Sequence, residues 1–177
     1  MREQLFKTER LFFSSWTEAD DQLAERLWGN QEVTRFITKE ARLSQKQVLQ
    51  RLASEIESQK KFGFQYWPIF LREDALFVGC CGLHMYDKKN QIAELGVHLL
   101  PSAWGKGLAM EAANGVIDYA TQETTLIMLF AGHHPDNHAS GNLLKKLGFE
   151  FQGRFDYEPT GLAHPSYLRT LRRDLEE

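Results

Sequence analysis

Two glycines separated by a single residue stand between a strand pattern and a helix pattern near the middle of the chain. The segment reads Pro101-Ser102-Ala103-Trp104-Gly105-Lys106-Gly107-Leu108-Ala109. Glycines at such a turn let backbone N–H groups converge, and the N-terminus of the following helix favours an anion. The turn therefore predicts a pyrophosphate site built from main-chain amides, with a plain structural turn as the alternative.

Two common nucleotide-binding patterns do not fit this turn. A Walker A loop has Ser or Thr directly after its lysine, but Lys106 is followed by Gly107. The dinucleotide fingerprint requires Gly or Ala at the place of Met110, and it opens a parallel unit instead of following a meander. Both classes of nucleotide-binding protein are excluded.

The spacing of the apolar residues predicts one mixed α/β sheet. The expected strands cover residues 11–13, 64–71, 75–86, 92–100, 126–131, 149–157 and 167–171, and the expected helices cover residues 19–28, 44–61, 107–119 and 140–147. Residues 64–100 carry three strand patterns joined by short turns, which is typical of an antiparallel meander. No repeat or long linker divides the chain, so residues 1–177 are expected to form a single domain.

Two of the expected helices carry further signals. Thr17, with Asp20 three residues later, is typical of a helix start. Helix 44–61 has an apolar stripe on an otherwise charged surface, which predicts that this stripe packs on the core. Its members are Val48, Leu52 and Ile56 at four-residue steps, with Leu49 and Ala53 beside them.

The charge pattern limits the partners of the chain. The 21 basic and 24 acidic residues give a net charge of −3 and are spread along the sequence, so no basic stripe is present to neutralise a nucleic acid. No apolar run approaches the roughly 20 residues that cross a bilayer, and the polar start of the chain lacks the apolar core of a signal peptide. We expect no nucleic-acid or membrane partner and a cytoplasmic location.

The two cysteines, Cys80 and Cys81, are neighbours within an apolar strand pattern. Successive side chains of a strand point to opposite faces, so a structural disulfide is not expected. Nothing nearby marks a reactive thiolate, and buried thiols that pack as small apolar groups are the prediction.

Three segments together resemble the GNAT superfamily of acyl-CoA N-acyltransferases. The turn Trp104-Gly105-Lys106-Gly107 resembles the Trp-Gly-x-Gly pyrophosphate loop of the Rim-type (RimJ/RimL) ribosomal-protein N-terminal acetyltransferases. Ser102 differs from the Arg or Gln of the family pattern, although main-chain amides hold the phosphates in this fold. The other two segments are Thr8-Glu9-Arg10-Leu11 with Glu32 to Ile37, and Asn137-His138-Ala139-Ser140 followed by Lys146-Leu147-Gly148-Phe149. The resemblance is strongest over residues 8–149.

The resemblance implies a fold, a co-substrate and a set of binding residues. The implied GNAT fold has about seven strands and four helices, and its sheet is splayed between the fourth and fifth strands, where acetyl-CoA enters. No metal is implied. The residues expected to bind CoA are His98, Leu99, Leu100, Trp104, Gly105, Lys106, Gly107, Leu108, Ala109, Asn137 and Ser140.

Gly96 lies inside the strand 92–100, where glycine is a poor strand residue. Such a glycine marks a bulge or a close approach by another backbone. By resemblance, the pantetheine arm of CoA enters the splayed gap and hydrogen-bonds to the strand backbone around His98 to Leu100. A main-chain N–H there is then expected to polarise the thioester carbonyl as an oxyanion donor.

An acceptor ammonium group must lose a proton before its nitrogen can attack a thioester. Glu94 is the first candidate base, because desolvation raises the pKa of a carboxyl in an apolar strand and the family often has Glu here. A surface carboxylate or a partner in an ion pair is the alternative interpretation. His98 lies two residues beyond Gly96 on the same nominal face and is the reserve base.

Asn137 stands before a helix pattern and is expected to cap it. By resemblance, Asn137 also contacts the CoA arm, and Ser140 reaches the sulfur and returns a proton to the departing thiolate. Many GNAT enzymes have a Tyr where this chain has Leu144. Ser140, a water molecule and direct proton transfer therefore remain open as the source of that proton.

His133, His134 and His138, with Asp136, are the densest group of metal-ligating residues in the sequence. Pro135 interrupts the helical spacing of His134 and His138, and no Cys or Glu completes the set. Solvated loop histidines near the CoA site are the preferred interpretation, and a metal hydrolase is the less favoured one.

The acceptor is expected to be an amine, and by resemblance a protein or peptide N-terminal amine. The family places its acceptor walls at about residues 26–42 and 156–166, where Asp156 and Glu158 either attract a cationic amine or are simply solvated. A small-molecule amine, such as a polyamine, an amino acid or an antibiotic, is the alternative acceptor. A non-catalytic acyl-CoA-binding module is the alternative function, and the sequence does not separate a monomer from a homodimer.

Overall fold

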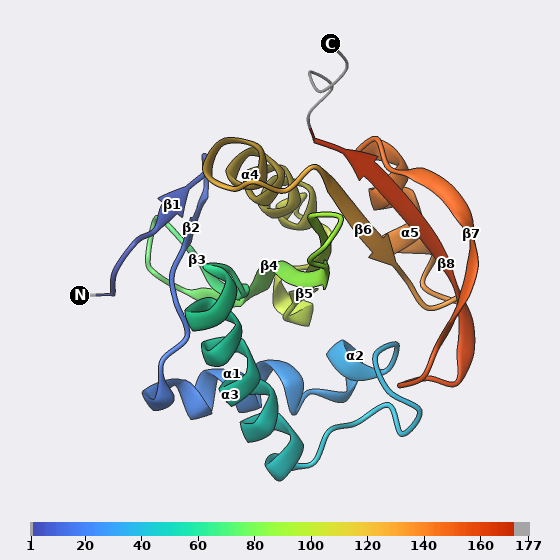
Figure 1. Cartoon of the computed structure of the whole chain (residues 1–177). Coiled ribbons are helices and arrows are strands. Elements are labelled where there is room, and N and C mark those ends of the chain that lie inside the picture. Colours follow the sequence, from blue (N-terminus) through green and yellow to red (C-terminus); the bar gives the residue numbers. More distant parts are fainter. Residues whose placement is uncertain (1, 172–177) are drawn as a thin grey trace.

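The computed structural model describes residues 2–171 of the chain, and these form one sheet of eight strands (Figure 1). Their order across the sheet is β1-β2-β3-β4-β5-β6-β8-β7. β5 and β6 pair in parallel, and all other neighbouring strands are antiparallel. The strands are β1 (Phe6–Lys7), β2 (Leu11–Phe13), β3 (Tyr66–Leu71), β4 (Phe77–Asp87), β5 (Ile92–Leu99), β6 (Met128–Gly132), β7 (Glu150–Tyr157) and β8 (Leu162–Thr170).

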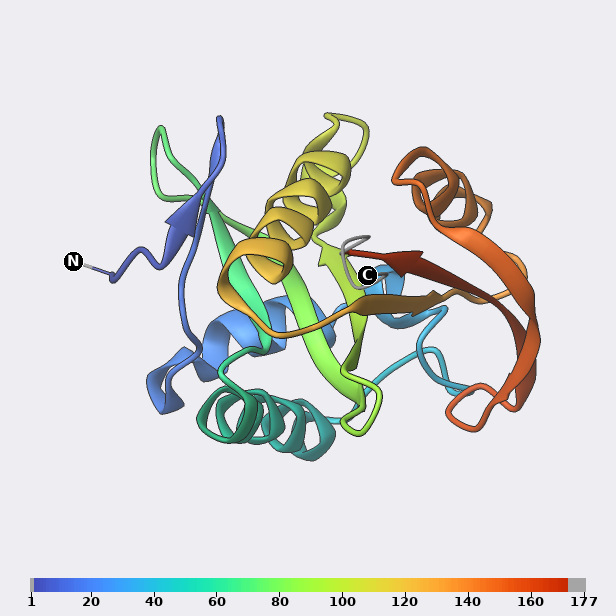
Figure 2. The ribbon, with the colours of Figure 1, turned by 45° about the horizontal axis from the view of Figure 1, so that its top comes forward.

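Helices cover both faces of the sheet. α4 and α5 lie on one face, whereas α1 and α3 lie on the other (Figure 2). The α-helices are α1 (Asp21–Trp28), α2 (Gln31–Thr34), α3 (Gln45–Phe62), α4 (Leu108–Glu123) and α5 (His138–Lys146), and two short 3-10 turns are η1 (Glu18–Asp20) and η2 (Pro101–Ala103). Among residues 2–171, no helix combines the length and apolar character that a membrane span requires.

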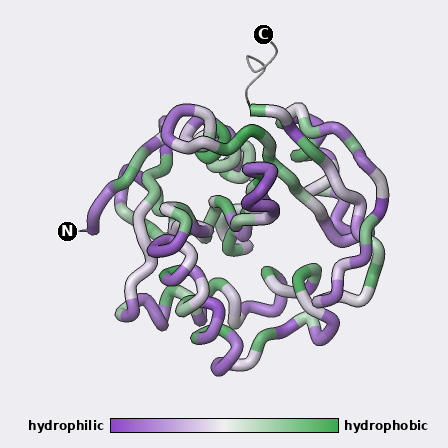
Figure 3. Tube along the Cα trace, viewed as in Figure 1, coloured by the Kyte–Doolittle hydropathy of each residue, from purple (hydrophilic) through white to green (hydrophobic). Residues whose placement is uncertain are grey.

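Two apolar cores form, one on each face. The core under α4 and α5 contains Trp67 and Leu129, and the core under α1 and α3 contains Trp28 and Phe70. Alternation of side chains along the strands makes this division, because successive residues of one strand point to opposite faces. In Figure 3 the trace of α3 changes repeatedly between hydrophilic and hydrophobic, as expected for a helix with one buried face.

Most predicted elements are confirmed, but the short elements β1 and α2 were not predicted. Thr17 and Asp20 form a reciprocal capping box at the start of η1, as their spacing predicts. β1 has two residues and α2 has four, which is too short for any periodicity to be visible. β8 begins at Leu162 rather than at 167 and contains Pro165, which is tolerated beside the register shift that opposes it in β7.

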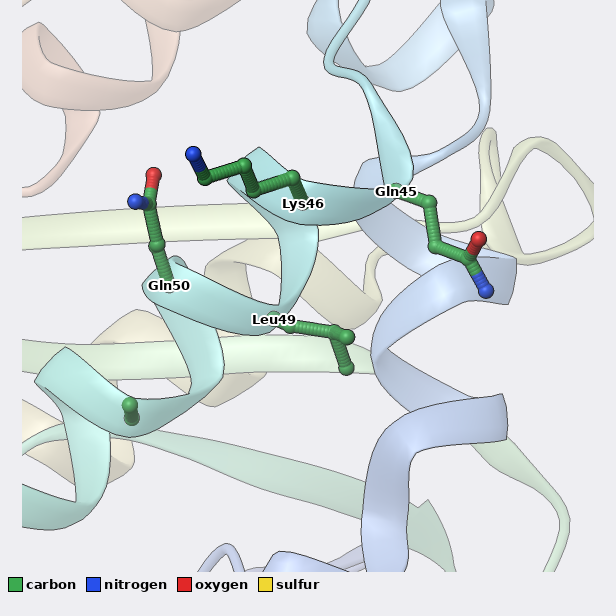
Figure 4. Close-up of a pocket in the computed structure, with 5 residues that line it drawn as sticks. Gln45, Lys46, Leu49 and Gln50 are labelled. Atoms are coloured by element: carbon green, nitrogen blue, oxygen red, sulfur yellow. The ribbon is translucent and has the colours of Figure 1, made fainter.

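The predicted stripe of α3 is partly wrong. Val48 and Leu52 are buried as expected, but Leu49 is 45% exposed and the third fully buried side chain is Glu55. Leu49 lies in a surface hollow of about 470 Å³, drawn in Figure 4, with Gln45, Lys46, Gln50 and Ala53. The buried face of α3 is thus rotated toward Glu55, because a buried carboxylate replaces one apolar residue of the stripe.

The sheet parts between β5 and β6, as the resemblance implies for the fourth and fifth expected strands. The parallel pairing covers only Ile92 to Glu94 of β5 against Met128 to Phe130 of β6. Beyond Glu94, β5 stays paired with β4 as far as Leu99. Within residues 2–171, therefore, no neighbouring strand occupies one edge of the second half of β5.

Candidate active site

The glycine turn connects β5 to α4 through the short turn η2. Gly105 and Gly107 have φ angles of +73° and +74°, which L-residues other than glycine rarely adopt. Gly107 is the N-cap of α4, and none of the described side chains caps the first turn of that helix. The N–H groups at this end of α4 therefore remain available to an anion. The loop residues predicted from the sequence, 104–109, surround this helix end.

An ion pair from the N-terminal segment braces the glycine turn. The Nε of Arg10 lies 2.6 Å from Oε2 of Glu111, and the Nη1 of Arg10 donates to the carbonyl of Lys106 at 2.9 Å. Thr8 donates its hydroxyl to Glu111 as well, at 2.6 Å. Burial raises the pKa of Glu111, but the hydrogen bonds from Thr8 and Arg10 outweigh it and lower that pKa overall. The segment 8–11 that carries the family resemblance thus fixes the turn.

Trp104 ties the same turn to the end of β5. Its indole Nε1 donates to the carbonyl of Leu99 at 2.9 Å, while the indole is 45% exposed. This hydrogen bond therefore fixes the position of the glycine turn relative to the free edge of β5.

Backbone groups of β5 alternate between β4 and the gap. The N–H of Leu100 donates to the carbonyl of Val78 at 2.9 Å, so residues 94, 96, 98 and 100 direct their backbone groups toward β4 and residues 95, 97 and 99 direct theirs toward the gap. Of the backbone N–H groups at His98, Leu99 and Leu100 that were predicted to bind the CoA arm, only that of Leu99 faces the gap. The carbonyl of Leu99 is already occupied by Trp104.

Side chains of β5 alternate between the two cores. Ala93, Leu95 and Leu99 pack in the core under α4, so Glu94, Gly96 and His98 lie on the face of α1 and α3. Beyond Glu94, β5 therefore has an apolar face toward α4, a polar face toward α1 and α3, and an unpaired edge toward the gap.

Glu94 stands where β6 leaves β5, since its pairing with Phe130 is the last one recorded between these strands. Burial raises the pKa of the Glu94 carboxyl above its ordinary value, and the charges of His84 and Arg51 partly oppose this. Among residues 2–171, no side chain or backbone group is hydrogen-bonded to this carboxylate. The carboxylate of Glu94 is therefore a stronger base than that of an ordinary glutamate.

His98 is held in its neutral form. Its Nδ1 accepts a hydrogen bond from the Trp28 indole at 3.1 Å and lies 3.8 Å from the Sγ of Cys80. Burial, together with the charges of Arg51 and His84, lowers the pKa of His98 to about 3. A group with this pKa is a weak base near neutral pH, so the geometry favours Glu94 over the reserve candidate.

Neither cysteine is suited to nucleophilic chemistry. Cys80 and Cys81 are both free and buried, as the sequence predicts. Burial raises the pKa of the Cys80 thiol well above its ordinary value and that of Cys81 likewise. Both groups stay protonated, because the thiolate is disfavoured in an apolar surrounding.

A buried carboxylate, Glu55 of α3, organises the polar face near Glu94. Its Oε1 lies 2.7 Å from Nε2 of His84 and 3.2 Å from Nε of Arg51, and its Oε2 accepts the backbone N–H of Tyr66 at 2.8 Å. Sequence reasoning missed this cluster. The i, i+4 spacing of Arg51 and Glu55 is visible in the sequence, but such charged pairs are typical of exposed helix faces, so the spacing did not predict burial.

On the opposite side of the gap, Asn137 caps α5 as predicted. Its side chain accepts the backbone N–H of Ser140 at 3.2 Å. Leu144, at the position of the usual Tyr, is buried. Gly141 packs against His133, because a Cβ at position 141 would lie 3.0 Å from its Nε2. Tight packing under α5 therefore explains this glycine.

The three loop histidines differ from the expected solvated set. His133 is buried, its Nδ1 lies 2.8 Å from the carbonyl of His134, and its Nε2 lies 3.2 Å from the hydroxyl of Tyr167. His138 is exposed. The prediction of solvation is wrong for His133, because the ring fills the space beneath Gly141. Within the described part of the chain, no three His, Cys, Asp or Glu side chains come together in a way that would hold a metal.

The two expected acceptor walls meet. The N–H of Lys39 donates to the carbonyl of Pro159 at 2.9 Å, and the side chain of Lys39 contacts Gly161. Asp156 and Glu158 are both exposed, which agrees with the interpretation that they are solvated. The loop after α2 and the loop between β7 and β8 therefore form one continuous wall beside the polar face of β5.

A mixed sheet that parts beside an uncapped helix N-terminus, with a carboxylate at the start of the gap, defines this protein as an acyltransferase. The domain family described as acetyltransferase (GNAT) domain matches residues 10–150. The chain belongs to the GNAT family.

Known proteins of this family resemble the chain along most of its length. The N-acetyltransferase p20 of Bacillus licheniformis is 31% identical over 154 residues, which are 85% of each chain. RimL, a ribosomal L7/L12 alpha-N-protein acetyltransferase solved with coenzyme A, has a TM-score of 0.79 at 16% identity and covers 95% of this chain and 98% of its own. The microcin C7 self-immunity acetyltransferase MccE, solved with acetyl-CoA and AMP, has a TM-score of 0.76 at 14% identity, with 92% and 93% covered. At these identities the two structures show the fold alone.

Proposed function

We propose that this protein transfers an acetyl group from acetyl-CoA directly to a primary amine, with Glu94 as the general base. One observation carries this proposal: β6 leaves β5 immediately after the pair Glu94 and Phe130. A carboxylate of raised pKa thereby stands at the entrance of the gap in which the family inserts its thioester. The base and the free backbone edge belong to the same strand.

The residues present fit coenzyme A as the donor. The N–H groups at the start of α4, shaped by Gly105 and Gly107, suit a pyrophosphate. Leu108 and Ala109 are the first residues of that helix. Trp104 precedes Gly105, and Lys106 lies between the two glycines. The complexes of RimL with coenzyme A and of MccE with acetyl-CoA support this role for the shared fold.

The transfer needs no covalent enzyme intermediate. Glu94 removes a proton from the acceptor amine, directly or through an ordered water, and the amine nitrogen attacks the thioester carbonyl. The N–H of Leu99 holds the oxyanion that develops. As the C–S bond breaks, the nitrogen loses its second proton, and the thiolate takes up one proton from a water molecule or from Ser140, which regains a proton from water. Cys80 takes no part, because its thiol is protonated.

Two acceptor classes follow from the relatives. RimL is a ribosomal L7/L12 alpha-N-protein acetyltransferase, which supports a peptide N-terminal amine as acceptor. MccE, with AMP in its structure, supports a small-molecule amine. A non-catalytic acyl-CoA-binding module is the remaining function, and Leu144 in place of the usual Tyr supports it.

The experiment is to titrate the purified protein with acetyl-CoA in a calorimeter and then to measure thiol release with a panel of peptides and small amines. Saturable acetyl-CoA binding together with amine-dependent thiol release is the expected result. Binding without release for any amine would identify a binding module. No binding to the folded protein would refute the proposal as a whole.

A further inference from the structure

Arg51 of α3 extends onto the same polar face as Glu94. Its guanidinium carbon lies 5.1 Å from the ring centre of Trp28 and 5.5 Å from that of Tyr66. Its Nε is 3.2 Å from Oε1 of Glu55. The aromatic faces and the single bond to Glu55 fix the plane of the guanidinium, as cation–π contacts do.

The terminal nitrogens of Arg51 are unused. A guanidinium carries five N–H donors, and Nε alone has a hydrogen-bond partner among residues 2–171. The side chain is only 23% exposed, so these donors have little bulk water around them. Burial disfavours the charged form, but Glu55 and neighbouring groups keep the pKa of Arg51 raised overall. Arg51 is therefore a fixed cation with free donors.

His84 connects Arg51 to Glu94. His84 and Arg51 meet at the same oxygen, Oε1 of Glu55, at 2.7 Å and 3.2 Å. His84 is also the direct cross-strand partner of Glu94 in the β4–β5 ladder, and cross-strand partners share a face of the sheet. The charge of Arg51 also acts on the Glu94 carboxyl and partly opposes the rise in its pKa that burial causes, so the cation stands near the proposed base.

We propose that Arg51 binds an oxyanion of the acceptor, so that the substrate is an amine that also carries a carboxylate or phosphoryl group. The proposal rests on the proposed function, since it concerns the acceptor of that same reaction. The planar guanidinium fork matches both kinds of oxyanion. Arg51 would hold the anionic group while Glu94 receives the proton of the amine, which places a zwitterion such as an amino acid across the polar face.

A purely structural role for Arg51 predicts a different effect of substitution on the turnover of amines. The bond to Glu55 and the contacts with Trp28 and Tyr66 use Nε and the face of the guanidinium. If these contacts were the whole function, removing the side chain would lower stability and would reduce turnover of every amine alike. Selectivity between charged and neutral amines therefore separates the two roles.

The test compares matched amines in the wild type and in Arg51→Gln. One arm sets phenylalanine against phenylalanine amide and phenethylamine, and the other sets phosphoethanolamine against ethanolamine. We expect kcat/KM of the wild type to favour the anionic member of at least one arm by about tenfold or more, and this ratio to be lost in Arg51→Gln. The arm that shows the preference identifies the oxyanion.

Two controls keep the result interpretable. Arg51→Lys retains a cation beside Glu55 without the guanidinium fork, so it should keep the fold and lose most of the preference. Lys61→Gln removes an exposed positive charge from the same helix and should keep the full preference. A wild type without preference for anionic amines, or a preference that survives in Arg51→Gln and Arg51→Lys, would overturn the proposal.

A calorimetric titration with N-acetylphenylalanine and with N-acetylphosphoethanolamine, the two anionic products, separates this proposal from the proposed function. Both probes need only the oxyanion site and no turnover. If no amine is acetylated but one product binds the wild type and not Arg51→Gln, the oxyanion site stands and the proposed activity fails. If amines are acetylated but neither product binds more tightly to the wild type than to Arg51→Gln, the activity stands and the oxyanion site fails.

Discussion

The ring of Tyr66 on β3 lies across Gly96 on β5, in the space that a side chain at position 96 would need. A Cβ there would overlap the Cζ and Oη atoms of Tyr66. The register Tyr66 to Gly82 to Gly96 runs straight across three strands, so the tyrosine reaches β5 over a second glycine. Sequence reasoning expected a bulge or a close backbone approach at Gly96, but the register is regular there and the close neighbour is a side chain.

Gly96→Ala should displace the Tyr66 ring and lower the free energy of unfolding by about 1–3 kcal/mol, as overpacked cores do. Urea unfolding checks this. Tyr66→Ala alone should also destabilise, since it leaves a cavity. The double variant should lose less stability than the two single variants lose together, because a Cβ at position 96 no longer overlaps a ring. Simple additivity would mean that the ring does not occupy this space.

Glu94→Gln should lower kcat by about 10²- to 10⁴-fold, the range that general base catalysis contributes. The raised pKa of Glu94 also predicts that kcat/KM of the wild type rises with pH as this carboxyl ionises, because only the carboxylate accepts a proton. Steady-state kinetics from pH 5 to pH 9 measure both effects. The affinity for CoA should stay unchanged in a calorimetric titration, and an unaltered kcat in the variant would remove Glu94 as the base.

Gly105→Ala and Gly148→Ala form a matched pair. Their φ angles are +73° and +78°, and nothing lies within 4 Å of a Cβ at either site. Each substitution should cost about 1–2 kcal/mol of stability, the strain of an L-residue in this conformation. Only Gly105→Ala should weaken CoA binding, because Gly105 lies in the turn before α4 and Gly148 follows α5. Equal CoA affinities measured by calorimetry would argue against a phosphate site at this turn.

Ser140→Ala tests the proton donor. The backbone N–H of Ser140, not its hydroxyl, is bound by Asn137, so the variant should keep its stability. If Ser140 protonates the thiolate, kcat should fall while KM for acetyl-CoA changes little. Asn137→Ala is the contrasting variant, and it should lose about 1 kcal/mol of stability with its helix cap. An unchanged kcat in Ser140→Ala would leave a water molecule or direct transfer as the proton source.

Stability should decrease as the pH falls below about 6.5, the ordinary pKa of histidine. Burial lowers the pKa of His164 to about 4, so between these values the unfolded chain binds a proton that the folded chain does not. The loss approaches about 1.4 kcal/mol per pH unit for one such group. The raised pKa of Glu94 changes stability with pH in the opposite direction. The contribution of His164 is therefore read from the difference in pH dependence between the wild type and His164→Gln. Urea unfolding at pH 7.5 and pH 5 should show a smaller loss in His164→Gln, and the exposed His138 provides a control variant, His138→Gln.

Local patterns predicted the long elements and the glycine turn because these depend on neighbouring residues. The turn at Gly105 and Gly107 and the capping box at Thr17 belong to this group. The end of the β5–β6 pairing was expected only from the family resemblance. The polar face did not emerge from the sequence, since it joins residues that are far apart in the chain. Glu55 and His84 are separated by 29 positions, and no period or spacing links a helix residue to the strand on which it will pack.

Strand β5 separates the two cores, and the alternation of its residues decides which groups face each side. Its odd-numbered residues pack in one core and open their backbone to the gap, whereas its even-numbered residues face α3 and bind their backbone to β4. Inserting or deleting one residue between Glu94 and Leu99 would exchange these roles for every residue that follows. A change in the length of β5 would therefore break the alignment between its polar face, its free edge and the glycine turn at once.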